Sequence, residues 1–66
     1  MRVHLNGEPR EVPESMTVAE LLSSFNLGAV RVAVEVNLAI VSRARYPEHR
    51  LAEGDLVEVV SFVGGG

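Results

Sequence analysis

Three glycines that follow an apolar run are the residues of this 66-residue sequence best suited to chemistry. The run covers residues 56–63, and Gly64, Gly65 and Gly66 come after it. Glycine has no Cβ and loses the most backbone entropy when it is ordered, so this segment adds no stability. It is either a frayed end or a thin probe that carries the carboxylate of Gly66 into another protein's active site. We therefore divide the chain into a folded domain, 1–62, and a flexible glycine tail, 63–66.

The remaining polar candidates do not form a catalytic or metal-binding pattern. His4 and His49 lie far apart, lack metal-ligand spacing and have no neighbouring nucleophile, so we expect a solvent-facing strand residue and a loop residue. Tyr46 is interpreted as a loop anchor, because a lone aromatic is not a nucleic-acid surface. Glu53 and Asp55 are too few ligands for a cation, and turn chemistry accounts for Asp55. We expect no catalytic residue and no metal.

Size and composition indicate a carrier or substrate rather than an enzyme. Apolar residues make up 47% of the chain and there is no cysteine, so compact packing without disulfides must hold one small domain. A domain of this length has little room for an enclosed active site. The net charge of −3 is spread along the chain, which argues against a nucleic-acid partner, and no stretch is long enough to span a membrane. The first residues resemble a strand rather than a signal segment, which points to the cytoplasm.

All six cationic side chains are arginines, and lysine is absent. One interpretation is a coding or thermal bias toward arginine. The other is chemical: an activated carboxyl group would acylate a lysine amine, whereas a guanidinium stays protonated and inert.

The first elements predicted are a hairpin and a helix. Residues 2–5 alternate as a strand, and Asn6-Gly7 supplies the positive φ angles of a tight turn into a short second strand at 10–12. Flanking prolines place that strand near an edge of the sheet. Thr17 and Glu20 then form a capping box, which predicts a helix over roughly 18–26. Gly28 is the predicted C-terminal cap.

The second half of the chain predicts strands. Residues 32–36 alternate with a period of two, 40–41 begin a short strand, and 43–51 are polar and irregular. Gly54-Asp55 turns the chain into the last strand. One helix on one face of a mixed sheet of four to five strands is an α+β fold.

In the last strand, Val57 and Val59 share one face with Ser61, and the opposite face carries apolar side chains from Leu56, Val60 and Phe62. We predict that these three residues form a docking surface beside the glycine tail. The alternative is that a loop covers them, because strand alternation alone does not identify the solvated face.

This order of elements and the glycine end together resemble the ubiquitin-like β-grasp fold, and most closely its thiamine-biosynthesis sulfur carriers. The resemblance covers nearly the whole chain. The matching segments are Asn6-Gly7, residues 17–22, residues 32–37, residues 51–60 and residues 62–66.

The resemblance implies that the chain binds no cofactor and acts as a co-substrate. An adenylating enzyme of the ThiF type would use ATP to adenylate Gly66. A persulfide sulfur donor would then convert the adenylate to a thiocarboxylate, which would give its sulfur to thiazole synthase of the ThiG type. Gly64 and Gly65 would thread into the partner. The four residues 63–66 reach at most about 13 Å when fully extended, which limits how far the carboxylate of Gly66 can enter.

Asn37-Leu38 departs from the family, which commonly has Asn-Gly at this turn. Leucine tolerates positive φ poorly, so a turn of another type or a longer turn is expected. Carriers for the molybdenum cofactor usually have prolines before the glycines, and Ser61-Phe62-Val63 has none. A carrier for tRNA thiolation, or a ubiquitin-like modifier that forms amides with lysines on target proteins, remains an alternative.

Overall fold

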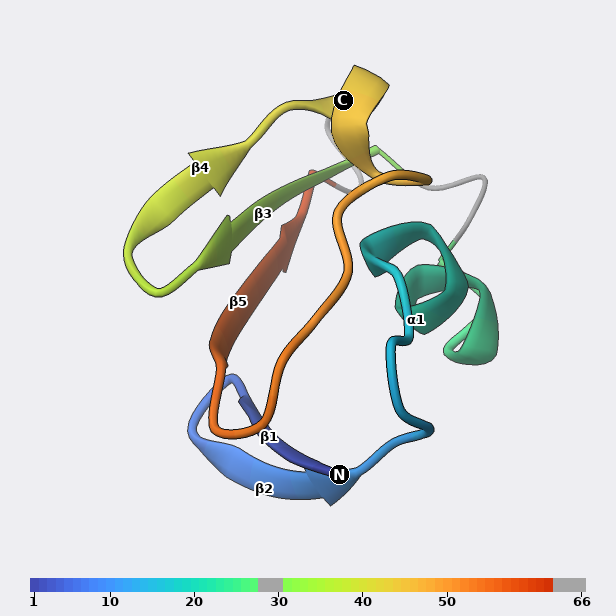
Figure 1. Ribbon diagram of the computed structural model, residues 1–66. Helices are drawn as coiled ribbons and strands as arrows, with labels where there is room; N and C mark the ends of the chain where they lie inside the picture. The colour runs from blue at the N-terminus through green and yellow to red at the C-terminus, as the bar shows by residue number, and fades with distance from the viewer. Residues whose placement is uncertain (28–30, 63–66) are drawn as a thin grey trace.

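Five strands form one mixed sheet with a single α-helix on one face in the computed structural model, which describes residues 1–27 and 31–62 (Figure 1). The elements are β1 (Arg2–Leu5), β2 (Glu8–Glu11), α1 (Val18–Ser24), β3 (Val32–Val36), β4 (Ala39–Val41), the 3-10 helix η1 (Arg43–Arg45) and β5 (Leu56–Ser61). The strand order is β2-β1-β5-β3-β4, and only β1 and β5 run parallel. The predicted α+β arrangement is confirmed, whereas Gly28 and the predicted tail, 63–66, lie outside the described residues.

The β1–β2 hairpin turns at Asn6-Gly7, as predicted. Asn6 has a φ of 50° and Gly7 a φ of 86°, the two positive values that a tight two-residue hairpin requires. Strand β2 begins at Glu8, two residues earlier than predicted, and pairs only with β1. Pro9 therefore lies on an edge strand, where its missing donor breaks no central ladder.

Helix α1 begins at the predicted capping box. The Glu20 backbone N–H donates to Thr17 Oγ1 at 3.1 Å, and the Thr17 N–H donates to Glu20 Oε1 at 2.9 Å. The helix ends at Ser24 with Phe25 as its C-cap, before the predicted end at 26, and Asn26 rather than Gly28 supplies the left-handed residue after the cap, with a φ of 61°. The Leu27 N–H then reaches back to the Leu22 carbonyl at 2.8 Å. Asparagine tolerates left-handed backbone, which lets the helix end without glycine.

The core lies between the sheet and α1. Its fully buried side chains come from β1, α1, β3 and β5, and they are Val3, Val18, Leu21, Val34 and Val57. Leu51, from the segment that crosses this face between η1 and β5, completes the cluster. Its N–H donates to the Met16 carbonyl at 2.8 Å, so the crossing segment is fastened to the start of α1 (Figure 1). Within the two described ranges, no helix is long and apolar enough to cross a membrane.

The segment between β4 and β5 contains η1, which the sequence did not indicate. Tyr46 directly follows η1, and its hydroxyl donates to the Val32 carbonyl at 3.3 Å. Its own carbonyl accepts from the Ala19 N–H at 3.0 Å. The prediction that Tyr46 anchors a loop is confirmed, since it joins this segment to both β3 and α1.

The β3–β4 turn corrects the expectation of a longer or different turn. Val36 pairs directly with Ala39, so only Asn37 and Leu38 form the turn, with φ angles of 53° and 71°. A leucine in left-handed backbone costs roughly 1–2 kcal/mol. The side chain of Asn37, which bonds to the residues that begin β5, holds the turn in this shape despite that cost.

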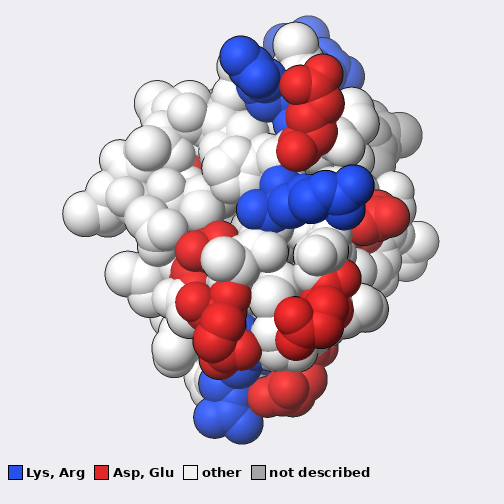
Figure 2. All heavy atoms as spheres, viewed as in Figure 1, with Lys and Arg blue, Asp and Glu red and all other residues white. Residues whose placement is uncertain are grey.

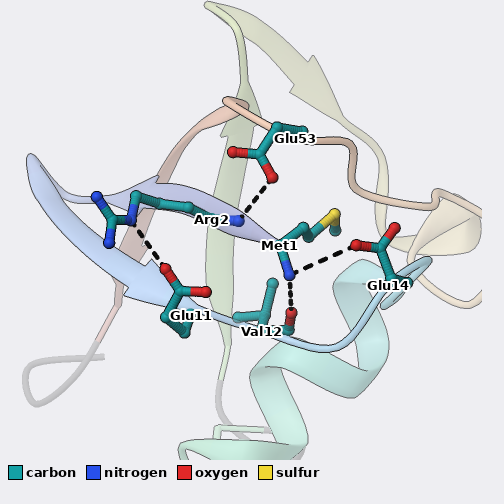
Figure 3. A network of polar contacts seen from close by, with 6 residues as sticks. All are labelled: Met1, Arg2, Glu11, Val12, Glu14 and Glu53. Atoms are coloured by element: carbon teal, nitrogen blue, oxygen red, sulfur yellow. Dashed lines mark hydrogen bonds and ion pairs between the residues drawn. The ribbon is translucent and has the colours of Figure 1, made fainter.

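A polar network joins β1 to its neighbours near the start of the chain (Figure 3). The Met1 ammonium donates to the Val12 carbonyl at 2.8 Å, and the Arg2 guanidinium pairs with Glu11 at 2.9 Å. The Arg2 backbone N–H donates to Glu53 Oε1 at 2.9 Å. The network therefore ties β1 both to β2 and to the turn that precedes β5.

Candidate functional site

Strand β5 leads directly into the glycine segment and is paired along both edges. It lies between β1 and β3, and its register with β3 runs from Val36↔Val57 to Val32↔Ser61. Beyond the strand, the Phe62 N–H donates to the Arg31 carbonyl at 2.9 Å. The chain is therefore held by the sheet up to its last described residue, Phe62. The predicted functional glycines Gly64, Gly65 and Gly66 lie outside the described residues.

Two asparagine side chains from the hairpin turns hold β5 in place. Asn6 accepts from the Val59 N–H at 2.8 Å and donates to the Val59 carbonyl at 3.1 Å. Asn37 accepts from the Leu56 N–H at 2.9 Å and donates to Asp55 Oδ1 at 3.0 Å. Because both asparagines have left-handed backbone, the same residues turn the hairpins and fix the strand that leads to the glycines.

The predicted docking residues are exposed on the face of the sheet opposite α1. Leu56, Val60 and Phe62 are 49%, 57% and 55% exposed, so no segment within the described residues covers them. Val60 lies opposite Ala33 of β3, which extends the apolar surface across the strand pair. Glu58 lies between Leu56 and Val60 on the same face. The surface therefore has a part beside Phe62 and a separate part at the start of β5. Whether a partner docks here stays a prediction.

The sequence did not indicate the high exposure of two further apolar side chains, Leu38 and Ile40, which are 84% and 79% exposed. Ile40 lies opposite Glu35 in the β3–β4 ladder, and Glu35 lies opposite Glu58. Ile40 is thus on the same open face of the sheet. Predicting a two-residue turn at Asn37-Leu38 would have fixed the β3–β4 register and placed Ile40 on the open face. The leucine, however, argued against such a turn.

The other polar candidates remain apart. His4 lies on β1 as predicted, opposite Leu56 on the open face, but it is half-buried rather than fully solvent-facing, and its buried Nδ1 has no hydrogen-bond partner within the described residues. His49 lies in the connection after η1, as expected for a loop residue. Glu53 and Asp55 accept hydrogen bonds from backbone N–H groups of residues 2 and 52, which supports their interpretation as turn residues. No group of three or more potential metal ligands occurs in the described part of the chain.

Comparison with protein families gives a match over residues 3–66 to the family described as the ThiS family. The chain belongs to the ThiS family. This match includes β5 and the glycine segment, so the region that sequence analysis singled out is part of the family pattern.

The relatives of this chain include proteins of two kinds with a named function. The chain is 38% identical to the sulfur carrier protein ThiS of Bacillus subtilis over 65 residues, which cover 97% of this chain and 98% of that protein. It is also 46% identical to a thiazole synthase of Magnetococcus marinus over all 66 residues, which make up only 20% of that protein. The chain thus spans about one fifth of the length of this thiazole synthase relative.

A solved structure confirms the fold. The crystal structure of the thiamine biosynthesis protein ThiS from Geobacter metallireducens matches with a TM-score of 0.84 and 36% identity, and all of both chains is covered. The predicted ubiquitin-like β-grasp fold of the ThiS family is therefore shown.

Proposed function

We propose that this chain is a sulfur carrier in thiamine biosynthesis and that the carboxyl group of Gly66 carries the sulfur. The family match that includes the glycine segment is the observation that supports this most strongly. The sulfur carrier protein from Bacillus subtilis, which matches over nearly its whole length, supports the same function.

The proposed chemistry starts from a carboxylate, which is a poor electrophile because it is ionised and would have to expel oxide. A partner enzyme therefore transfers AMP from ATP to the Gly66 carboxylate and releases pyrophosphate. A persulfide sulfur attacks the resulting acyl-adenylate and expels AMP, which forms an acyl disulfide. A second thiol then opens this disulfide and leaves the Gly66 thiocarboxylate.

In this proposal the folded domain contributes no catalytic group and binds no cofactor. It acts as a protein co-substrate, and its part is to present the glycine segment. Gly64 and Gly65 pass through a narrow channel of the partner, because any Cβ would widen the segment. The paired edges of β5 and the two asparagine contacts fix the position from which this segment begins.

Docking offsets the entropy lost when the glycines become ordered in the partner. Fixing each residue costs roughly 1–2 kcal/mol, and glycines offer few contacts in return. The exposed side chains of Leu56, Val60 and Phe62 are suited to this, because the first two lie on β5 and Phe62 directly follows it, ahead of the glycines. An apolar surface of this kind is typical of protein interfaces.

The proposed acceptor of the sulfur is a thiazole synthase. A segment similar to this entire chain makes up one fifth of the thiazole synthase of Magnetococcus marinus. Covalent linkage of two such domains in a relative supports a functional partnership when they are separate chains.

Growth of a strain that lacks its own ThiS-family carrier tests the proposed function. The full chain should restore growth without thiamine, and a chain that lacks Gly65 and Gly66 should not. Glu8→Gln, a change on the exposed edge strand β2, serves as the matched control and should restore growth fully. Growth of the shortened chain without thiamine would reject the proposal.

A further inference from the structure

The two edges of the sheet differ in how they are protected. Strand β2 forms one edge with the sequence Glu8-Pro9-Arg10-Glu11, so charges and a proline guard it. Such residues prevent another strand from pairing with an exposed edge. Strand β4 forms the other edge, and residues 38–42 contain neither a charge nor a proline. The β4 edge is therefore the open one.

The backbone of β4 offers hydrogen-bonding groups to a new strand. In a two-residue hairpin, the two residues that flank the turn, here Val36 and Ala39, form a hydrogen-bonded pair. Hydrogen-bonded and non-hydrogen-bonded pairs then alternate along the ladder, so Glu35 and Ile40 form a non-hydrogen-bonded pair. The N–H and carbonyl of Ile40 consequently point away from β3. Within residues 1–27 and 31–62 no other segment bonds to them. Ser42 continues the extended backbone with φ −71° and ψ 152°, and its hydroxyl makes no cap bond to η1.

Beside this edge lies an open groove of about 620 Å³, on the face of the sheet that α1 covers elsewhere. Its lining includes Ala39 and Val41 from β4, and Arg45, His49 and Arg50 from η1 and the segment that follows it. In the space-filling view, uncharged surface covers the region of β4, and basic side chains lie across from it (Figure 2). An added strand would therefore send every second side chain into this groove.

The groove is locally positive, although the protein carries a net charge of −3. Arg45 and Arg50 face a single lining carboxylate, Glu48, which pairs weakly with Arg45 at 3.4 Å on the exposed surface. Arg50 donates one Nη1 bond to the Ser15 carbonyl at 3.1 Å. Both guanidiniums keep further N–H donors for an incoming carboxylate.

We propose that the β4 edge binds an extended segment of a partner protein in which acidic and apolar residues alternate. The segment adds a strand to β4 through the Ile40 backbone groups. Its carboxylates enter the groove toward Arg45 and Arg50, and its apolar side chains cover the exposed Ile40 on the open face. A second copy of this chain is disfavoured as the occupant, because it would bring two arginine pairs together. This proposal does not depend on the chemistry of Gly66.

Titration of the ¹⁵N-labelled full chain with defined peptides tests the proposal without ATP or any enzyme. The probe is the acetylated, amidated peptide Gly-Val-Glu-Val-Glu-Val-Gly. We expect the amide signals of residues 39–42 to shift and hydrogen exchange of the Ile40 amide to slow by at least about tenfold. A peptide with lysine in place of glutamate should bind at least about fivefold more weakly. A peptide with proline in place of the central valine should not bind, because it cannot complete the ladder.

Two charge-matched variants separate the groove from general electrostatics. Arg45→Glu should weaken binding of the glutamate peptide at least about fivefold. Arg43→Glu makes the same change of charge in η1, at a residue that does not line the groove, and should have less than about a twofold effect. Both residues are exposed, and dispersed amide spectra would show that both variants fold.

Four results would overturn the proposal. They are no binding at millimolar peptide concentration, shifts confined to β2 or to the Leu56, Val60 and Phe62 surface, equal affinity for the lysine peptide, and equal losses in the two arginine variants. A dimer of the free chain that already buries the Ile40 amide would also overturn it.

Discussion

Asn6 binds the backbone of Val59 through both polar atoms of its side-chain amide: Oδ1 accepts from the Val59 N–H at 2.8 Å, and Nδ2 donates to the Val59 carbonyl at 3.1 Å. The last backbone hydrogen bond between this end of β1 and β5 runs from the Asn6 N–H to the Val57 carbonyl, at 2.8 Å. Backbone pairing of the two strands therefore ends before Val59. The side chain therefore continues the ladder after the backbone of β1 has turned away. This contact supports the half of β5 nearest the glycines.

Asn6→Asp tests that contact. Aspartate also tolerates left-handed backbone, so the turn is kept, but it cannot donate to the Val59 carbonyl. We expect the free energy of unfolding in urea to fall by about 1–3 kcal/mol and amide exchange in β5 to quicken. Glu8→Gln, on the same hairpin, is the control and should change stability by less than about 0.5 kcal/mol. A loss for Asn6→Asp no larger than that of the control would show that the contact adds nothing.

Leu38→Gly should stabilise the protein. Leu38 has a φ of 71° and is 84% exposed, so glycine removes strain and loses little packing. After the greater flexibility of glycine in the unfolded chain is subtracted, the expected gain is about 0.5–1 kcal/mol. Leu38→Ala keeps the Cβ and is expected to give no gain. Equal stability of the glycine and alanine variants would mean that the turn is not strained.

Phe62→Ala should weaken binding to the adenylating partner and leave the fold intact. The ring is 55% exposed, and aromatic residues at interfaces often contribute more than about 1 kcal/mol. We expect the dissociation constant measured by calorimetry to rise about tenfold. Leu38→Ala, an exposed change at the β3–β4 turn, should leave the affinity unchanged. An unaltered affinity of Phe62→Ala would remove Phe62 from the proposed docking surface.

Arg31→Lys tests the chemical interpretation of the missing lysines. Arg31 accepts from the Phe62 N–H, so a lysine there lies beside the end of the described chain. Without lysine, the amine of the chain is the Met1 ammonium, which donates to the Val12 carbonyl and lies 3.6 Å from a Glu14 carboxylate oxygen. With ATP and the adenylating partner but no sulfur donor, the lysine amine should attack the Gly66 acyl-adenylate, expel AMP and form an amide.

Arg31→Gln is the matched control for that variant, and intact mass and a denaturing gel are the measurements. Amide-linked products should appear only for Arg31→Lys. If the lysine variant forms no more of them than the glutamine variant, the absence of lysine reflects composition bias alone.

Local sequence signals predicted much of the fold because they act over a few residues. Asn6-Gly7 and the Thr17 capping box formed as expected, and alternation over 56–62 correctly separated buried Val57 from the exposed side chains of the predicted docking surface. The helix end was less predictable, because Asn26 and Gly28 can both adopt left-handed backbone. The sequence therefore favoured Gly28 as the residue that ends the helix in left-handed backbone, whereas Asn26 adopts that conformation.

Contacts between distant segments account for what the sequence did not show. Leu38 argues locally against a two-residue turn, and the bonds from Asn37 to Asp55 and Leu56, which lie far along the chain, support the turn that forms. The exposure of Ile40 depends on that register. The open β4 edge and its arginine-lined groove likewise need the strand order, which joins segments far apart in the chain.

Sulfur transfer to Gly66 is tested most directly by the intact mass of the chain after incubation with ATP, the adenylating partner and a persulfide sulfur donor. We expect a mass gain equal to the exchange of one oxygen for one sulfur, which fragmentation places on Gly66. The gain should require ATP and should be absent when Gly65 and Gly66 are removed. An unchanged mass under conditions in which the partner modifies a known ThiS-family carrier, or sulfur found on any other residue, would disprove sulfur transfer to Gly66.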